Sequence, residues 1–597
     1  MCGIAGAFAF ADGAPAPDPA IVARLNEAQR RRGPDGAGLW LSARKAAVLG
    51  HRRLSIIDVG ATGAQPMQDA SRRWTISFNG EIYNYAELRQ ELEGRGRRFT
   101  SGSDTEVLIN AVAEWGEAGL TRLRGMFAFA LWDEAEQELW LVRDPFGVKP
   151  LFWAESAGTI WFASQARPLA AHAPISPKRD AAGMVGFYLW GAVPEPFTWW
   201  EAICLLPAGH VLRIGARKSL PQPRSFCQIA DGLLAPRKAP ALTQTPTQDL
   251  RTALIDSVRH HLVADVPVGV FLSSGIDSTA IAELATEVKG KIQTVCLAFD
   301  AYLGTDRDEA PLAEETARLL GAEHRTVRLS RDQVMAAIED FLVAMDQPTT
   351  DGLNSYLVSQ ATAGAGLKAA LSGLGADELF GGYPSFAHIP KLLSLGKALP
   401  FRSAFGGWLE PFGRLMPGAG LRKYPSAVKY SGDLESAYFL RRCLHLHWEL
   451  DALADPRLRE EGLARLKDAQ HSGVARTKDL ERAAGLRTAI SEMELCRYMR
   501  NQPLRDADWA SMAHGLEVRV PFLDAPLLGC VAGAMASPRP FGKSDLAACA
   551  GPVTRRLAGR RKTGFTTPIG EWDKSRSGLK GWAKTVARRF DAAGAAP

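Results

Sequence analysis

The chain has 597 residues, of which 46% are hydrophobic and 23% charged, a balance typical of a globular protein with several domains. Its net charge of +6, from 71 basic and 65 acidic residues, is too small to indicate a nucleic-acid partner. Eight cysteines without a C-x-x-C pair are too sparse for a disulfide scaffold and favour a reducing cytoplasm. No apolar run reaches the roughly 18 residues of a membrane helix, so no membrane partner is expected.

The first part of the chain, residues 1–214, is predicted to form short strands with intervening helices. Its apolar start has no basic residues before it, so it predicts a buried strand with Cys2 at its beginning rather than a secretory signal. Helical spacing of apolar residues marks 85–93 and 105–115. Strand-like runs lie at 74–78, 127–133, 139–143 and 160–163.

The composition changes after this part. Scattered prolines between 215 and 246 predict a linker or a long surface connection. Residues 247–590 then alternate strand-like runs with helical ones, which indicates a parallel sheet covered by helices. The strand-like runs are 268–272, 292–299, 324–329 and 367–371, with helical runs at 278–288 and 308–320 and mostly helical residues from about 390 to 535. The last residues, 591–597, are predicted to be disordered.

Cys2 is a candidate nucleophile because of its position. If Met1 is removed, one residue carries a thiol and a free α-amine, whose ordinary pKa of about 7.7–8.0 lets it act as the local base. A small buried cysteine is the plain alternative, and position 2 alone does not decide between them. Four downstream motifs favour the nucleophile: R-G-P-D-G at 32–36, R-L-S-I-I-D at 53–58, F-N-G-E-I-Y-N at 78–84 and S-D-T-E at 103–106.

These motifs contain the groups that an acyl-thioester mechanism needs. The Asn79 side chain and the Gly80 backbone N–H are donors for a developing oxyanion. A glutamine substrate also presents an α-carboxylate, which suits bidentate pairing with Arg53, and an α-ammonium, which suits Asp104.

Two later loops indicate a phosphate site. The run 268–272 ends in S-S-G-I-D-S at 273–278 before a helix, and small residues there let backbone N–H groups approach a phosphate. A turn that caps a helix is the alternative for this loop taken alone. The loop 372–383 follows another strand and adds Asp377, which together with Asp277 offers two carboxylates for Mg²⁺.

The first motifs, with C-G-I-A-G at 2–6, resemble the class II glutamine amidotransferase domain, and the two loops resemble the asparagine synthetase family. The stretches M-A-H-G-L-E-V-R-V-P-F-L-D at 512–524 and R-R-K-T-G-F at 560–565 extend the second resemblance, which covers nearly the whole chain together with the first. It implies an α/β protein: an N-terminal Ntn-hydrolase αββα sandwich followed by a doubly wound parallel-sheet synthetase domain, like the adenine nucleotide alpha hydrolases, with added helices. It also implies glutamine hydrolysis, cleavage of ATP between the α and β phosphates, an acyl-adenylate and a homodimer.

The resemblance further implies roles for individual residues. Lys562 is expected to stand beside the leaving pyrophosphate, with a solvated lysine in a basic run as the alternative. Cys2, Asn79, Gly80 and Lys562 are the expected catalytic residues. Glutamine is expected to bind at Arg53, Leu54, Ile56, Ile57, Asn79, Gly80, Glu81 and Asp104. ATP is expected to bind at Leu272, Ser273, Ser274, Gly275, Ile276, Asp277, Ser278, Leu297, Ser372 and Gly373, with Asp277 and Asp377 on Mg²⁺.

One departure concerns the acceptor. Leu374 stands where the best-known asparagine synthetases have Glu, which is thought to handle protons as ammonia attacks the adenylate. Leucine cannot accept a proton, so either another residue does this or the acceptor is not aspartate. The polar run 351–356 is a candidate acceptor pocket, with an ordinary loop as the alternative.

The expected activity is ATP-dependent amidation of aspartate with nitrogen from glutamine. The alternative is amidation of another carboxylate, in a sugar acid, a natural product or a peptide. A purely ring-closing ligase is disfavoured, because an internal amine needs no ammonia from Cys2. A non-catalytic sensor is disfavoured by the joint presence of Cys2, Asn79, Asp277, Asp377 and Lys562.

Overall fold

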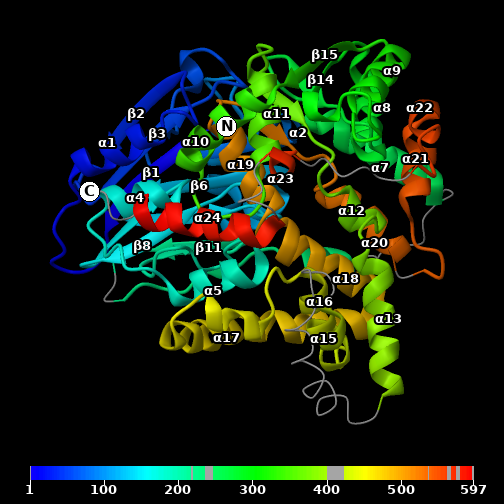
Figure 1. Cartoon of the computed structure of the whole chain (residues 1–597). Coiled ribbons are helices and arrows are strands. Elements are labelled where there is room, and N and C mark those ends of the chain that lie inside the picture. The colour runs from blue at the N-terminus through cyan, green and yellow to red at the C-terminus, as the bar shows by residue number, and fades with distance from the viewer. Residues whose placement is uncertain are drawn as a thin grey trace.

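The computed structural model describes residues 2–216, 219–234, 246–399, 423–535, 537–560, 567–572 and 578–593. In Figure 1 the antiparallel sheets of the N-terminal half lie on the left of the view, and the strands β14 and β15 of a parallel sheet lie at the upper right. Two long helices, α17 (Pro456–Ala484) and α24 (Gly578–Ala593), cross the lower and front parts of the molecule.

The N-terminal half is built on two antiparallel sheets whose inner faces share a core. In the described residues each sheet has six strands, in the orders β10-β8-β9-β1-β3-β2 and β12-β11-β7-β6-β5-β4. Buried side chains from both sheets, such as Ile4, Phe162 and Trp132, fill the space between them. The strands are β1 (Gly3–Ala9), β2 (Gly36–Leu41), β3 (Ala47–Arg53), β4 (Met67–Gln68), β5 (Trp74–Ile82), β6 (Gly125–Asp133), β7 (Glu138–Arg143), β8 (Phe152–Ser156), β9 (Thr159–Ala163), β10 (Ile203–Leu205), β11 (His210–Ile214) and β12 (Arg224–Ser225).

Helices cover the outer faces of both sheets. On one side, α2 (Tyr85–Gly94) and α3 (Asp104–Trp115) pack their apolar residues on β5 and β6. On the other side, α1 (Pro19–Ala28) and α4 (Ala166–His172) cover the sheet that contains β1. The predicted αββα sandwich is therefore confirmed.

The C-terminal half contains a parallel sheet with the order β15-β14-β13-β16-β17. The chain adds strands on one side of β13 and then returns to add β16 and β17 on the other. This order creates a topological switch point between β13 and β16, where ligands of doubly wound sheets bind. The strands are β13 (Val268–Phe271), β14 (Gln293–Phe299), β15 (Glu323–Leu329), β16 (Ala369–Leu371) and β17 (Glu517–Arg519).

Helices surround this sheet and build the rest of the C-terminal half. None of the described helices combines the length and the apolar character needed to cross a bilayer. They include α7 (Pro246–His261), α8 (Ile276–Lys289), α9 (Ala310–Leu320), α10 (Arg331–Ala344), α11 (Leu353–Ala363), α12 (Ala376–Phe380), α13 (Ser385–Ala398), α15 (Lys423–Lys429), α16 (Leu434–Arg442), α18 (Leu486–Met493), α19 (Pro503–Met512), α20 (Ala525–Met535), α21 (Lys543–Ala550), α22 (Pro552–Arg555) and α23 (Ile569–Trp572).

Two boundary segments differ from the sequence-based expectation. Within the predicted linker, α6 (Ile229–Leu234) buries Ile229 and Leu233 in a core cluster, because a short apolar run lies between the prolines. At the C-terminus, α24 continues to Ala593, so the helix includes 591–593 of the predicted tail. Residues 594–597 lie outside the described residues.

The two halves share a hydrophobic core. One cluster joins Ile56 and Phe146 of the N-terminal half to Leu272 and Phe522 of the C-terminal half. Burial of apolar surface from both halves in one cluster fixes their relative position more firmly than a linker alone.

Candidate active sites

Cys2 lies immediately before β1, at the edge of the sandwich. Its side chain is only 6% exposed, and its backbone N–H donates to the Asn79 Oδ1 atom at 3.0 Å. Burial raises the pKa of the thiol, while a hydrogen bond with the Leu54 backbone opposes that shift. A buried thiol of raised pKa needs a nearby base to become a nucleophile.

Asn79 and Gly80 lie at the end of β5, beside Cys2. Asn79 is fully buried, and its Nδ2 atom has no hydrogen-bond partner among the described residues. A side chain at position 80 would meet the Met126 carbonyl oxygen at 2.1 Å, so only glycine fits there. An unpaired buried donor next to the thiol is the arrangement that an oxyanion site requires.

The predicted glutamine-binding loop after β3 lies at the contact between the two halves. The Arg53 guanidinium donates to the backbone carbonyls of Gly60, at 2.7 Å, and of Asp58. These bonds fix the guanidinium within its own loop. Leu54, Ile56 and Ile57 are buried and belong to the shared core cluster.

Glu81 and Asp104 complete this first site with buried carboxyl groups. Asp104 follows the helix cap Ser103 and accepts a hydrogen bond from the Ile82 N–H at 2.9 Å. Burial raises the pKa of Asp104 to about 6 and the pKa of Glu81 well above its ordinary value. The Arg519 guanidinium lies 3.7 Å from Glu81, and the buried carboxyl group of Asp104 suits a cationic part of a ligand.

The two loops of the second site meet at the switch point of the parallel sheet. A side chain added to Gly373 would lie 3.0 Å from the Asp277 Cβ atom and 3.1 Å from the Ser278 nitrogen. In the first loop the hydroxyls of Ser273 and Ser278 are 2.8 Å apart, and Gly275 is the N-cap residue of α8, which has no side-chain cap among the described residues. The N–H groups in the first turn of a helix are suited to bind an anion.

The two predicted metal-binding carboxylates face one cation. Lys543, at the start of α21, forms ion pairs with both Asp277 and Asp377, the latter at 2.7 Å. The arrangement fits Mg²⁺, which is commonly held by one or two carboxylates together with substrate phosphates. Sequence reasoning missed Lys543, because nothing in its local sequence marks it as a partner of carboxylates more than 150 residues away.

The other predicted nucleotide residues surround these loops. Leu272 continues β13 and its N–H donates to the Val295 carbonyl at 2.9 Å, while Leu297 is a buried residue of the neighbouring strand β14. The Ser274 hydroxyl donates to Glu309 at 3.2 Å, and Ile276 opens α8. The Ser372 N–H donates to the Arg519 carbonyl at 2.8 Å. Lys562 lies outside the described residues.

A buried charge cluster connects Cys2 to the C-terminal half. Arg32 donates to the Cys2 carbonyl at 3.1 Å and to both oxygens of Asp508, on α19, at 2.7 and 3.1 Å. Lys149 lies 3.5 Å from the same carboxylate. The three side chains are at most 2% exposed. Sequence analysis placed Arg32 in a motif but had no signal for Asp508, which depends on how the two halves pack.

The fold and the two sites define an amidotransferase: a glutaminase sandwich joined to a nucleotide-binding synthetase domain. Residues 1–224 match a family described as glutamine amidotransferase domain, and residues 249–593 match one described as asparagine synthase. The chain thus belongs to the asparagine synthase family and carries a glutamine amidotransferase domain.

Curated relatives agree with this assignment. A putative glutamine-hydrolysing asparagine synthetase of Mycobacterium tuberculosis is 33% identical over 96% of this chain and 88% of the relative. Asparagine synthetase 1 of Bacillus subtilis is 31% identical over 98% of this chain and 90% of the relative. A solved glutamine phosphoribosylpyrophosphate amidotransferase from B. subtilis is 14% identical, over 62% of this chain and 81% of that one, and its TM-score of 0.29 is too low to carry an argument.

Proposed function

We propose that the protein is a glutamine-dependent amide ligase that consumes ATP. Glutamine, ATP, water and a carboxylic acid give glutamate, AMP, pyrophosphate and an amide. The observation that carries the proposal is the presence of both sites in one chain: Cys2 beside Asn79, and Asp277 and Asp377 facing one cation.

In the glutaminase step, the Cys2 sulfur attacks the side-chain amide of glutamine and forms a thioester. The free α-amine of Cys2, once Met1 is removed, takes the thiol proton and passes it to the departing ammonia. The Asn79 Nδ2 atom and the Gly80 N–H stabilise the tetrahedral oxyanion. Water then hydrolyses the thioester to glutamate.

Glutamine is held by charges at its amino-acid end. Arg53 pairs with the α-carboxylate and Asp104 with the α-ammonium, while Leu54, Ile56 and Ile57 line the loop and Glu81 adds a second buried carboxyl. The bonds from Arg53 to the carbonyls of Gly60 and Asp58 fix the guanidinium before substrate arrives.

In the synthetase step, the acceptor carboxylate attacks the α-phosphorus of ATP, releases pyrophosphate and becomes an acyl-adenylate. The first-turn N–H groups of α8 and the hydroxyls of Ser273 and Ser278 bind the pyrophosphate. Mg²⁺, when bound by Asp277 and Asp377, would neutralise charge on the leaving group. Lys543 supplies a positive charge at the same place, and Lys562 a further one. Ammonia attacks the acyl carbon and displaces AMP.

Two acceptors are candidates. L-Aspartate is the one expected from the sequence, and the curated relatives are named for asparagine synthesis. A different carboxylic acid is favoured by Leu374, which lies half-buried against the shared core where the resembled enzymes have a glutamate. We propose that the protein works in the reducing cytoplasm and that it acts as a homodimer.

The test is to measure pyrophosphate release by the purified chain with ATP, Mg²⁺ and a panel of carboxylic acids, with either glutamine or ammonium as nitrogen donor. We expect acid-dependent release of AMP and pyrophosphate with both donors. Binding of glutamine and ATP without any turnover, in the presence of every acid, would instead identify a sensor.

A further inference from the structure

A large cavity lies between the two halves and is not part of the loops described above. It has a volume of about 1030 Å³ and is lined by residues of the N-terminal half, such as Trp190 and Glu195, together with residues of α16, α17 and α11. Pockets for drug-sized ligands span about 300–1,000 Å³, so a single amino acid would fill only a small part of this space.

The lining combines positive charge with aromatic rings. Lys423, Arg441, Arg442, Arg476, Arg497 and Arg500 face three acidic residues, Glu195, Asp351 and Glu492. The rings belong to Trp190, Phe197, Tyr438, Tyr498 and Trp582. An excess of cations beside aromatic faces suits an anionic ligand with a ring or an apolar portion.

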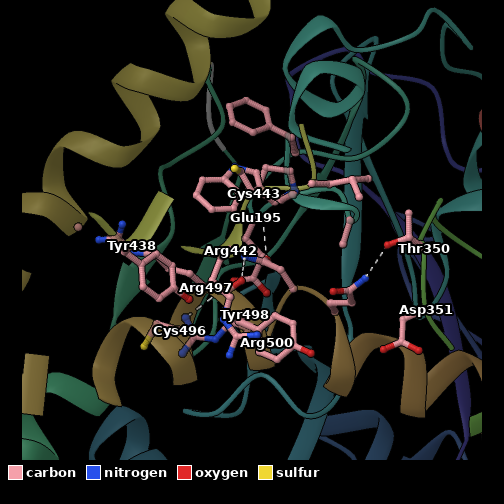
Figure 2. A pocket seen from close by; sticks show the side chains of 18 of the residues that line it. Glu195, Thr350, Asp351, Tyr438, Arg442, Cys443, Cys496, Arg497, Tyr498 and Arg500 are labelled. Atoms are coloured by element: carbon pink, nitrogen blue, oxygen red, sulfur yellow. Dashed lines mark hydrogen bonds and ion pairs between the residues drawn. The ribbon is translucent and has the colours of Figure 1, made fainter. Parts of the chain in front are cut away.

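Several of these cations already have carboxylate partners. Arg442 pairs with Glu494 at 2.6 Å, and Arg497 pairs with Glu435 at 2.7 Å. Figure 2 shows Arg442, Arg497 and Arg500 gathered with Glu195 and Tyr498, and Asp351 across the pocket from them.

Arg441 and Lys423 differ from this group. The Arg441 Nε atom has no hydrogen-bond partner among the described residues. The Lys423 Nζ atom donates to backbone carbonyls, one of them that of Leu440 at 3.3 Å, rather than to a carboxylate. Arg441 and Lys423 are therefore cations of the cavity that can pair with an anion from a ligand.

The wall of the cavity touches the synthetase site. The rings of Tyr498 and Tyr383 are 5.7 Å apart, and the Arg442 guanidinium lies over both, at 3.7 and 4.4 Å. Tyr383 follows Gly382, where a side chain would come within 1.9 Å of the Asp377 carboxylate. The part of the wall that holds Tyr498 and Arg442 thus lies against the segment that follows Asp377. Asp351 and Asn354, from the candidate acceptor run, also line the cavity.

We propose that this cavity binds the body of an acceptor larger than aspartate: a carboxylic acid with a ring or apolar portion and a second anionic group, which pairs with Arg441 and Lys423. The inference rests on the proposed ligase function.

The test compares small and large dianionic acids on the full chain. Pyrophosphate release is measured with ATP, Mg²⁺ and ammonium chloride against L-aspartate, L-aspartyl-L-phenylalanine and N-benzoyl-L-glutamate. We expect kcat/KM to be at least about tenfold higher for one of the large acids than for aspartate. Arg441→Ala should raise the KM of that acid about tenfold or more and leave the KM of ATP unchanged. Arg482→Ala, at a side chain that is 77% exposed on α17, is the matched control and should change neither.

A second measurement separates this inference from the ligase function. Trp190 and Trp582 line the cavity, so binding of the large acids is followed by tryptophan fluorescence without turnover. Quenching that Arg441→Ala weakens, without pyrophosphate release for any acid, would show that the cavity binds such acids but would refute the ligase function and, with it, their role as acceptors. Turnover of aspartate alone, unaffected by Arg441→Ala, would overturn the cavity proposal and leave the ligase function intact. Neither turnover nor quenching with the large acids would overturn it as well.

Discussion

The two candidate sites differ in how they are built. The glutaminase site gathers Cys2, Asn79 and Asp104 from a strand start, a strand end and a capped helix, all within one sandwich. The synthetase site joins two loops of a parallel sheet to Lys543 from α21, far along the chain. The first site therefore depends on local motifs, and the second depends on long-range packing.

Cys2→Ala separates the two sites most strongly. We expect glutamine-driven synthesis to fall by a factor of about 10⁴ or more, because removal of a covalent nucleophile eliminates the thioester route. Ammonia-driven synthesis should keep the rate of the parent protein, because the parallel-sheet site is unchanged. The measurement is pyrophosphate release with each nitrogen donor. Loss of both activities in a folded variant would contradict independent sites.

Lys543→Ala tests the other region. Removal of a cation shared by Asp277 and Asp377 should lower synthesis with either nitrogen donor by about 10²–10³-fold, because the leaving pyrophosphate loses a counter-charge. Glutaminase activity without ATP should stay within about twofold of the parent. Lys291→Ala, at a side chain that is 68% exposed, is the matched control. Equal losses in the two variants would refute a role for Lys543 at the site.

Asp508→Asn tests the connection between the regions. The change leaves Arg32 and Lys149 buried without their carboxylate, which costs about 3–5 kcal/mol of unfolding free energy. Urea unfolding followed by circular dichroism measures it. The double variant Arg32→Met with Asp508→Leu should cost less than the single change, because it leaves one buried cation, Lys149, without its carboxylate instead of two. If the single and double variants unfold alike, the pair does not stabilise the interface.

The pKa of Asp104 predicts how glutamine binding depends on pH. The pKa is raised to about 6, so the carboxylate that pairs with the α-ammonium is present above that pH and is lost below it. Glutamine affinity of Cys2→Ala, measured by calorimetry, should fall about tenfold per pH unit below about pH 6. Asp104→Asn should bind weakly without this slope. A flat profile for Cys2→Ala would exclude Asp104 as the partner.

Much of the fold could be predicted because its signals are local. Apolar periodicity and small-residue turns can be recognised within a short stretch of sequence. They predicted the strands β6, β7, β13 and β14 and the helices α2, α3 and α8. The short strand β17 could not be predicted in this way, because three residues carry no period and this strand depends on pairing with β16. The helix α6 was missed because the prolines around it predicted a linker, although none of them lies within the helix itself.

The candidate sites divide along the same line. The sequence motifs predicted that Asn79 acts together with Cys2 and that Asp277 and Asp377 belong to one site. It gave no indication that the Arg53 guanidinium is fixed by carbonyls of its own loop, or that Lys543 is the partner of the two carboxylates. Those facts depend on side-chain direction and on contacts between residues far apart in the chain.

The cluster of Arg32, Lys149 and Asp508 bears on how such a chain can be divided. A gene split near residue 235 would give one polypeptide with two cations, and another with a lone carboxylate, exposed at their newly opened faces. In each fragment, water would have to hydrate charges that are paired with one another in the intact molecule. Fission of this enzyme into separate subunits would therefore require compensating changes at these positions, or co-expression that restores the contact before either product encounters other proteins.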